Sequence, residues 1–392
     1  MISIIAYVLT KISVTIFAGA LVFEVMLGVP FWTGATLVVV ATGVYTVFGG
    51  LRAVIYTDMM QMFVLVGGAL AMGYFGFESL AEQAGNGASG WDTMMQLLSE
   101  NQDSEGSADY FNLWRSFEDS NYPWTGIVFG APILGIWYWC TDQFIVQRVL
   151  SAKNLSHARK GTLFGGFLKL TPIFLFVIPG ILAYTLSLNN PELLMNSQGE
   201  VDYDAALPAL VMNYLPVGFK GLVVAGLLAA LMSSLSSVFN SCSTLYTIDF
   251  YKKKRPDASE KQLVRVGQIA TGVLVLIGLA WIPMMKSMTE GEGIFKYLQS
   301  IQAYISPPIA AVFLLGLFFR RINAQGAMAS LWTGFVVGIS RLVAEYVTSG
   351  YEQGTALWNI APDSILAAFV GINFLHFALF LFVICSVVMV FV

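Results

Sequence analysis

Long apolar stretches recur along the whole of this 392-residue chain. A helix needs roughly 20 mostly apolar residues to cross the hydrocarbon core of a bilayer, and about ten stretches reach that length. They cover residues 2–28, 32–48, 54–78, 124–146, 161–187, 218–246, 266–285, 297–318, 326–346 and 366–390. Because only lipid can surround so many apolar helices, the sequence predicts an all-α polytopic membrane protein, with residues 1–392 forming a single transmembrane domain.

The composition agrees with this class. Hydrophobic residues make up 57% of the chain and charged residues 11%, less than half the charged share of about 25% in soluble domains. Turn-forming residues separate the stretches: Gly49-Gly50, Pro191, Pro256, Gly291 and Gly293, and the region around Gly350. We expect loops at these positions.

The sequence contains few of the features that mark an enzyme or a metalloprotein. Its three cysteines, Cys140, Cys242 and Cys385, lie inside apolar stretches, and its two histidines are far apart in the chain. This pattern suits neither a disulfide framework nor a metal centre. A nucleophile elbow and a zinc-binding HExxH motif are also absent. We therefore expect no enzymatic activity, no cofactor and no nucleic-acid partner.

Basic residues mark every second loop. They are Arg52; Arg148, Lys153, Arg159 and Lys160; Lys252, Lys253, Lys254, Arg255, Lys261 and Arg265; and Arg320 and Arg321. Cytoplasmic loops are enriched in Lys and Arg, so these loops, including 251–265, are predicted to be cytoplasmic, with Met1 on the same side. The acidic segments 80–122 and 188–215 are predicted to be extracellular. The longer one is expected to be either a solvated connection or a small external subdomain.

Ionisable residues fall within several of the apolar stretches. Asp58 begins the third, Asp142 lies near the end of the fourth, and Lys169 lies within the fifth. Such side chains are costly in the bilayer and usually belong to a binding site or a pathway. Simpler roles stay open, because Asp58 could cap its helix and Asp142 could pair with Arg148 near the membrane surface.

The stretch 218–246 is rich in serine. Ser233, Ser237 and Ser241 are four residues apart and therefore share one face of a helix. Small residues of this kind allow helices to pack closely. Hydroxyls and main-chain carbonyls together also suit a monovalent cation, for which Asp58 is a candidate neighbour. Both roles stay open.

Two stretches contain breaks of the kind that mark transporter sites. Gly130-Ala131-Pro132 precedes the aromatic run Trp137-Tyr138-Trp139, and Pro307-Pro308 follows Phe295 and Gln299. Interrupted helices in two halves of a chain point to a substrate site at the middle of the membrane. Flat aromatic faces, amides and one ammonium group suit a neutral polyol, although the same aromatics would also fit an interfacial belt.

Several long motifs resemble those of one family. They are WYWCTDQFIVQR at 137–148, GGLRAVIYTDMMQ at 49–61, LMSSLSSVFNSCSTLYTIDFY at 231–251 and SPPIAAVFLLGLFFRRIN at 306–323. These motifs are similar to those of the sodium/solute symporter family, and within it to the sodium/glucose cotransporter branch. The resemblance covers nearly the whole chain except the acidic loop and residues 350–365.

The resemblance implies a LeuT-type inverted-repeat bundle that binds sodium and substrate at mid-membrane. The family's common sodium site corresponds to the main-chain carbonyl of Ala230 and the hydroxyls of Ser233 and Ser234. A further sodium site found in some members would use Asp58 with Ser234 and Ser236, which suggests two sodium ions per cycle.

The resemblance also implies a sugar site. Tyr138, Lys169 and Gln299 correspond to the sugar contacts, Trp139 lines the site, and Phe295 acts as a gate. The implied activity is sodium-coupled symport of a glucose-like or galactose-like sugar by alternating access in the plasma membrane, with the compact loops suggesting a bacterial inner membrane. The implied partners are sodium, a neutral sugar or polyol, and the lipid bilayer.

Two departures from the family pattern affect these expectations. Gly135 replaces a polar contact three residues before the stacking tyrosine, so sugar selectivity is expected to differ. By the same comparison the chain begins in the third core helix and stops one helix short. The early core helices, with their sodium and sugar ligands, are then expected to be missing, and the chain is not expected to transport alone.

The alternatives are a symporter for myo-inositol, an amino acid or a carboxylate, and a membrane sensor that binds sugar without moving it.

Overall fold

The computed structural model describes residues 4, 7–85, 87–101, 110–195, 199, 201–289, 293–348 and 364–392. Within its helical segments, the side chains at residues 9, 44, 45, 47–55, 57 and 285–289 are not described. At Gly49-Gly50 the main chain is helical within α3 (Phe31–Ala84), so the loop predicted there is not present. The turns predicted at Gly291 and around Gly350 lie outside the described residues.

The described residues are almost entirely helical, as predicted. Among them, eight helices are long and apolar enough to cross a membrane: Thr10–Leu27, Asp58–Ala84, Leu155–Asn189, Val217–Lys254, Glu260–Met284, Gly293–Phe318, Ala324–Thr348 and Phe374–Phe391. Phe31–Gly43 and Gly126–Thr141 are shorter apolar helices at the predicted second and fourth spans. The prediction of an all-α polytopic membrane protein is therefore confirmed.

The chain divides into two compact units. The first, called here the Asp58 unit, contains Thr15–Asn112 and Ala152–Asn240. The second, the Asp142 unit, contains Met1–Val14, Leu113–Ser151 and Ser241–Val392.

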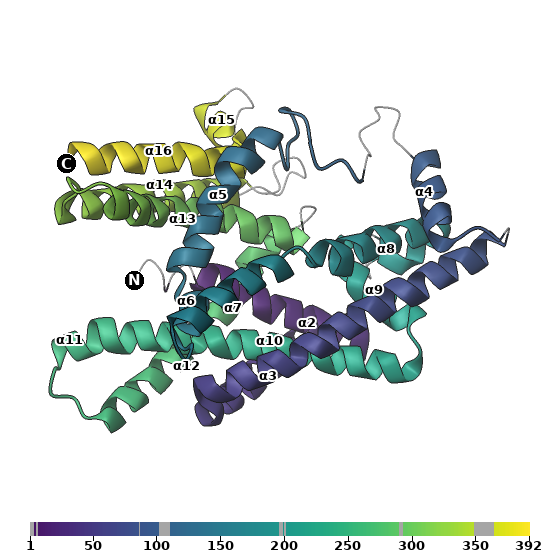
Figure 1. Ribbon diagram of the computed structural model, residues 1–392, viewed down its shortest axis with the longest axis horizontal. Helices are drawn as coiled ribbons and strands as arrows, with labels where there is room; N and C mark the ends of the chain where they lie inside the picture. Colours follow the sequence, from purple (N-terminus) through teal and green to yellow (C-terminus); the bar gives the residue numbers. More distant parts are fainter. Residues whose placement is uncertain are drawn as a thin grey trace. The chain divides into compact units, whose positions relative to one another are not determined.

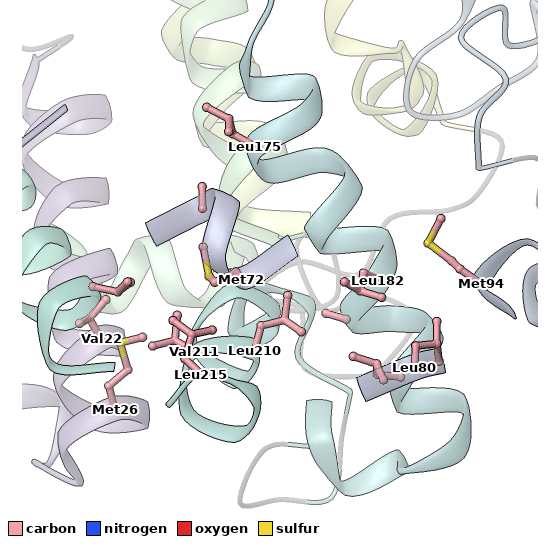
Figure 2. Close-up of a cluster of buried hydrophobic side chains, with 14 of the residues drawn as sticks. Val22, Met26, Met72, Leu80, Met94, Leu175, Leu182, Leu210, Val211 and Leu215 are labelled. Carbon is pink, nitrogen blue, oxygen red and sulfur yellow. The ribbon is translucent and has the colours of Figure 1, made fainter. Parts of the chain in front are cut away.

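The Asp58 unit is a bundle of apolar helices. Its elements are α2 (Ser13–Leu27), α3 (Phe31–Ala84), α4 (Gly90–Glu100), α7 (Leu155–Leu168), η4 (Ile173–Val177), α8 (Ile178–Asn189), η5 (Pro191–Leu194), η6 (Tyr203–Ala205), α9 (Ala206–Tyr214) and most of α10 (Val217–Tyr246). Leu80, Leu182 and Leu210 are fully buried in the cluster that holds these helices together (Figure 2). Glycine allows the close approach, because a Cβ at Gly76 would lie 2.6 Å from Leu182 Cδ2.

Part of the acidic segment 80–122 is folded. Ser89 begins α4 by accepting a hydrogen bond from the Asp92 N–H at 3.1 Å, a common helix N-cap. Met94 and Leu98 of α4 are buried in the hydrophobic cluster. The segment is thus more than a solvated connection, because one apolar face of a short helix packs on the bundle.

The Asp142 unit contains the other elements. They are η1 (Val8–Ile12), η2 (Gly126–Gly130), α5 (Ala131–Ile136), η3 (Trp137–Thr141), α6 (Gln143–Leu150), η7 (Thr247–Tyr251), α11 (Lys252–Lys254), α12 (Glu260–Thr289), α13 (Gly293–Phe318), α14 (Ala324–Thr348), α15 (Ile365–Gly371) and α16 (Phe374–Phe391). Helices α13, α14 and α16 pack side by side (Figure 1). Gly338 of α14 allows this approach, because a Cβ there would overlap the Tyr304 carbonyl oxygen of α13.

The two predicted helix breaks have different outcomes. Helix α13 is continuous from Gly293 to Phe318 with Pro307 and Pro308 buried inside it, so the predicted break is not present. Gly334 on α14 leaves room for the Pro308 ring, and packing of this kind can offset the lost main-chain hydrogen bonds. The fourth predicted span is interrupted, but at Asp142 (φ −72°, ψ 116°), where η3 ends and α6 begins, rather than at Gly130-Ala131-Pro132.

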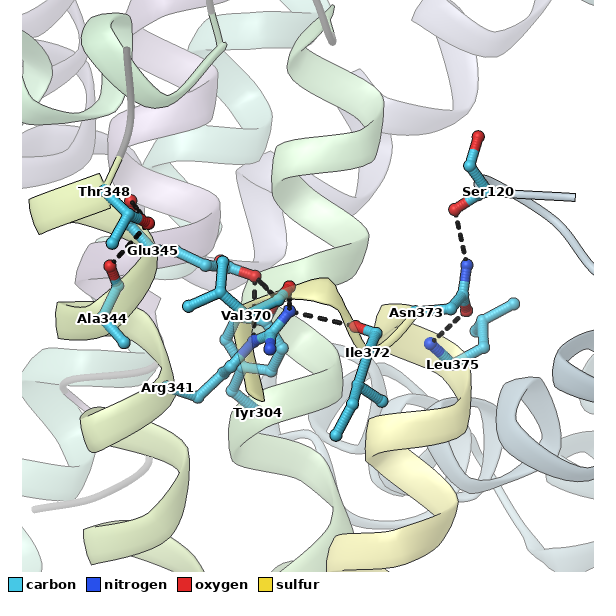
Figure 3. Close-up of polar contacts among 10 residues, drawn as sticks. All are labelled: Ser120, Tyr304, Arg341, Ala344, Glu345, Thr348, Val370, Ile372, Asn373 and Leu375. Carbon is cyan, nitrogen blue, oxygen red and sulfur yellow. Dashed lines mark hydrogen bonds and ion pairs between the residues drawn. The ribbon is translucent and has the colours of Figure 1, made fainter. Parts of the chain in front are cut away.

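A buried arginine joins three helices of the Asp142 unit (Figure 3). Arg341 of α14 pairs with Glu345 at 2.9 Å. Its Nη2 also donates to the carbonyls of Val370 at 2.5 Å and Ile372 at 3.0 Å, and the Tyr304 hydroxyl of α13 donates to Glu345. These contacts fix the junction between α15 and α16.

Candidate functional site

The predicted sodium ligands are all in the Asp58 unit. Ala230, Ser233, Ser234 and Ser236 lie on α10, and Asp58 lies on α3. Ser233 is buried, and its hydroxyl donates to the Asp58 carboxylate. The structure thus joins a residue of the common sodium set to the acid of the further set. The simpler role of Asp58 as a helix cap is not seen, because Asp58 lies inside α3.

Ser236 is the least satisfied of these residues. It is 1% exposed, and its hydroxyl has no hydrogen-bond partner in the described structure. A buried hydroxyl without a partner costs free energy, so it calls for an explanation such as an ion. The contact between Ser233 and Asp58 brings together a hydroxyl and a carboxylate, which are ligands that a hard cation prefers.

The Asp142 unit holds four of the five predicted sugar-site residues. Tyr138 and Trp139 lie on η3, Phe295 and Gln299 lie on α13, and the two elements pack against each other. Trp139 is 39% exposed and Phe295 60%. A Cβ added at Gly135 would meet nothing within 4 Å, which leaves open space one turn before Tyr138.

Lys169 belongs to the Asp58 unit. It follows the last residue of α7, and its main-chain N–H donates to the carbonyls of Gly165 at 3.1 Å and Gly166 at 3.2 Å. Its side chain is exposed.

A cluster around Asp142 was not foreseen in the sequence. The Asp142 carboxylate pairs with Lys11 of η1 and accepts a hydrogen bond from the Tyr7 hydroxyl. The Lys11 ammonium also lies 4.3 Å from the ring centroid of Phe144 and 5.0 Å from that of Tyr138. Tyr7, Lys11, Trp137, Tyr138, Asp142 and Phe144 are called the lysine cage below. One available signal was a lysine within the apolar stretch 2–28.

Asp142 pairs with Lys11, whereas Arg148, the partner that the sequence left open for it, makes other contacts. Arg148 instead donates to the Phe144 carbonyl at 2.6 Å, and its guanidinium lies over the Phe144 ring at 4.4 Å. Beside the cage is a cavity of about 80 Å³ whose lining includes Tyr7, Trp137 and Asp142. Its size and polar lining suit ordered water.

Comparison with known proteins identifies relatives of this chain. The model of the sodium:solute symporter family matches residues 1–334. Sodium/glucose cotransporter 1 of Oryctolagus cuniculus is 38% identical over 99% of this chain and 60% of its own length. A sodium/mannose cotransporter of Bos taurus is 39% identical over 99% of this chain and 65% of its own length. The chain thus spans about 60% of the length of the curated relatives it matches.

A solved structure supports the fold. A sodium-coupled sialic acid symporter in a substrate-bound, outward-open state aligns with a TM-score of 0.69 and 20% identity, covering 100% of this chain and 73% of the other. This likeness shows the shared bundle of the LeuT type rather than a shared substrate. With the match of the family model over most of its length, the chain belongs to the sodium:solute symporter family.

Proposed function

We propose that the protein containing this chain is a sodium-coupled symporter that carries a glucose-like or galactose-like sugar across the plasma membrane by alternating access. The observation that carries the proposal is the oxygen cluster of the Asp58 unit, where Ser233 meets Asp58 and the buried Ser236 hydroxyl has no partner in the described structure. The named relatives are cotransporters for sodium with glucose or mannose, so transport is favoured over an enzymatic role.

Sodium binding has a clear chemical basis in this proposal. The Asp58 carboxylate balances the charge of an ion, and the hydroxyls of Ser233, Ser234 and Ser236 with the Ala230 carbonyl replace water around it. The hydroxyl of Ser233 can turn from Asp58 toward the ion, because a hydroxyl is both donor and acceptor. Sodium is the coupling ion, and no other cofactor is required.

Sugar binding uses the other unit. The Tyr138 ring offers a flat face to a pyranose, the Gln299 amide supplies both a donor and an acceptor for hydroxyls, and Trp139 and Phe295 line and close the site. Lys169 is the further sugar contact that the family resemblance implies.

The test is uptake by the purified protein in proteoliposomes. An inward sodium gradient should drive accumulation of radiolabelled D-glucose or D-galactose, and a choline gradient of the same size should not. Unlabelled mannose, myo-inositol, an amino acid and a carboxylate, added as competitors, identify the substrate class. Sugar binding without flux would contradict the proposal and favour a sensor.

The sodium ligands are tested by single serine variants. Ser233→Ala and Ser236→Ala should each raise the half-saturating sodium concentration about tenfold, because each removes one oxygen ligand of the bound sodium ion. Ser386→Ala is the matched control, because this membrane serine donates to the Phe382 carbonyl of its own helix at 2.7 Å. An unchanged sodium dependence in both variants would refute the assigned sodium site.

A further inference from the structure

The ion pair inside the lysine cage is unusually enclosed. The side chain of Lys11 is 11% exposed and that of Asp142 is fully buried. Four aromatic rings surround the ammonium, with centroid distances from 4.3 Å at Phe144 to 5.9 Å at Trp137. Neither charge is needed for the sodium or sugar contacts proposed above, and a buried pair by itself adds little stability over apolar residues of similar size.

Asp142 also stands where the fourth span is interrupted. It leaves the helical conformation, and its carboxylate caps α6 by accepting from the Phe144 N–H at 3.0 Å. The two segments that meet in the cage, η1 and η3, are both π-helical. Single π-helical turns are rare and are often found at functional sites. The ion pair between Lys11 and Asp142 therefore lies at the junction of η3 and α6, which sets the direction of η3.

Tyr138 connects this junction to the substrate. The ammonium of Lys11 lies 5.0 Å from the Tyr138 ring centroid. A cation held over one face of a phenol ring is attracted to it and covers that face. The opposite face is then the one left for a sugar.

We propose that Lys11 is a positioning residue for the sugar site, holding η3 through Asp142 and through the Tyr138 ring so that Tyr138 and Trp139 face the substrate. The inference rests on the proposed function, in which these two residues meet the sugar. Lys11 itself makes no contact with sugar in this scheme.

The alternative is a lysine that only compensates the charge of Asp142. Lys11→Met leaves the buried carboxylate unpaired, so both roles predict damage from it. The double variant Lys11→Met with Asp142→Asn removes both charges while keeping side chains of similar size. If Lys11 only compensates charge, the double variant behaves as wild type. If it positions η3, the double variant stays defective, and Lys11→Arg, which retains a cation, recovers part of the activity.

The thiol of Cys140 can report on the conformation of η3. Cys140 lies on η3 and is exposed, whereas Cys242 and Cys385 are buried. We expect the rate of Cys140 alkylation by N-ethylmaleimide, in purified protein without substrate, to change severalfold in the double variant. The sugar KM should rise about tenfold with little change in the maximal rate, as expected for loss of a desolvated cation–aromatic contact. Lys220→Met is the control, because that half-buried lysine of the other unit donates to the Met212 carbonyl.

Wild-type values of both the alkylation rate and the KM in the double variant would overturn the inference. If Lys11→Met does not fold, the double variant and Lys11→Arg are each compared with the wild-type protein instead. If the wild-type protein shows no sodium-dependent uptake, the proposed function fails. The Cys140 rates would still decide whether Lys11 positions η3.

Discussion

Arg341 is a buried residue with several charged and polar contacts at one helix junction. It is 2% exposed, its guanidinium pairs with Glu345, and it holds two carbonyls at the α15–α16 junction. Removing one member of a buried ion pair leaves the other unpaired, which typically costs several kcal/mol.

We predict that Arg341→Met destabilises the protein by about 2–4 kcal/mol, a range reduced because Glu345 is partly exposed. Thermal unfolding in detergent should show a lowered midpoint. Arg341→Lys should be intermediate, since an ammonium cannot reproduce the forked contacts of a guanidinium. Arg320→Met, at an exposed position, is the control. A midpoint for Arg341→Met equal to that of the control would contradict this role.

The polar residues inside the apolar stretches indicated which side chains belong to candidate sites. The sequence did not show which residues those side chains contact. A carboxylate and serines within predicted spans pointed to Asp58 and Ser233, and the structure joins them. The sequence offered Arg148 as one possible partner of Asp142 because it is near in the chain, whereas the partner in the structure, Lys11, is 131 positions away. Only the packing of η1 on the folded chain brings that lysine to the carboxylate.

At the scale of elements, glycines set how closely helices pack. Gly338 of α14 faces the main chain of α13, where a Cβ would overlap the Tyr304 carbonyl oxygen. Gly316 of α13 faces open space, with nothing within 4 Å of an added Cβ. The two positions make a matched pair within one group of packed helices.

Gly338→Ala should destabilise the α13–α14 packing by about 1–3 kcal/mol, since main-chain atoms cannot move aside as a flexible side chain can. Gly316→Ala should be neutral or stabilising by up to about 1 kcal/mol, because alanine favours helix. Thermal midpoints of the two variants give the comparison. Equal midpoints would mean that α14 moves away at little cost.

Helix positions were largely predictable and helix breaks were not. The length of the apolar stretches predicted the spans, because the thickness of the bilayer sets a similar length for each of them. Proline suggested a break at Pro307-Pro308, but packing against α14 keeps α13 continuous. The break at Asp142 carries no glycine or proline and arises from side-chain contacts of its carboxylate.

At the scale of the whole molecule, the topology is a prediction from the basic loops. Two exposed positions test it, Glu118 in the acidic segment and Lys253 in the basic loop. In a Cys140→Ser background, Glu118→Cys should react with a membrane-impermeant maleimide in intact cells. Lys253→Cys should react only after the membrane is opened. The reverse pattern would invert every predicted span.

The number of sodium ions per cycle is also a property of the whole molecule. Two ions moving down 100 mV supply about 4.6 kcal/mol, enough for sugar accumulation of roughly a thousandfold or more, whereas one ion supports roughly fiftyfold. If Asp58, Ser234 and Ser236 bind a second ion, wild-type protein should carry two charges per sugar.

Asp58→Asn keeps the shape of the side chain and removes its charge, so the second ion would lose its counter-charge. We predict that the ratio of charge to sugar falls from about two to about one in this variant, and that the steepness of the sodium dependence falls with it. Asp249→Asn, at an exposed acid in η7, is the control. A wild-type ratio of one would assign Asp58 to the single common site. The contact between Ser233 and Asp58 would then reflect one ion shared by both ligand sets.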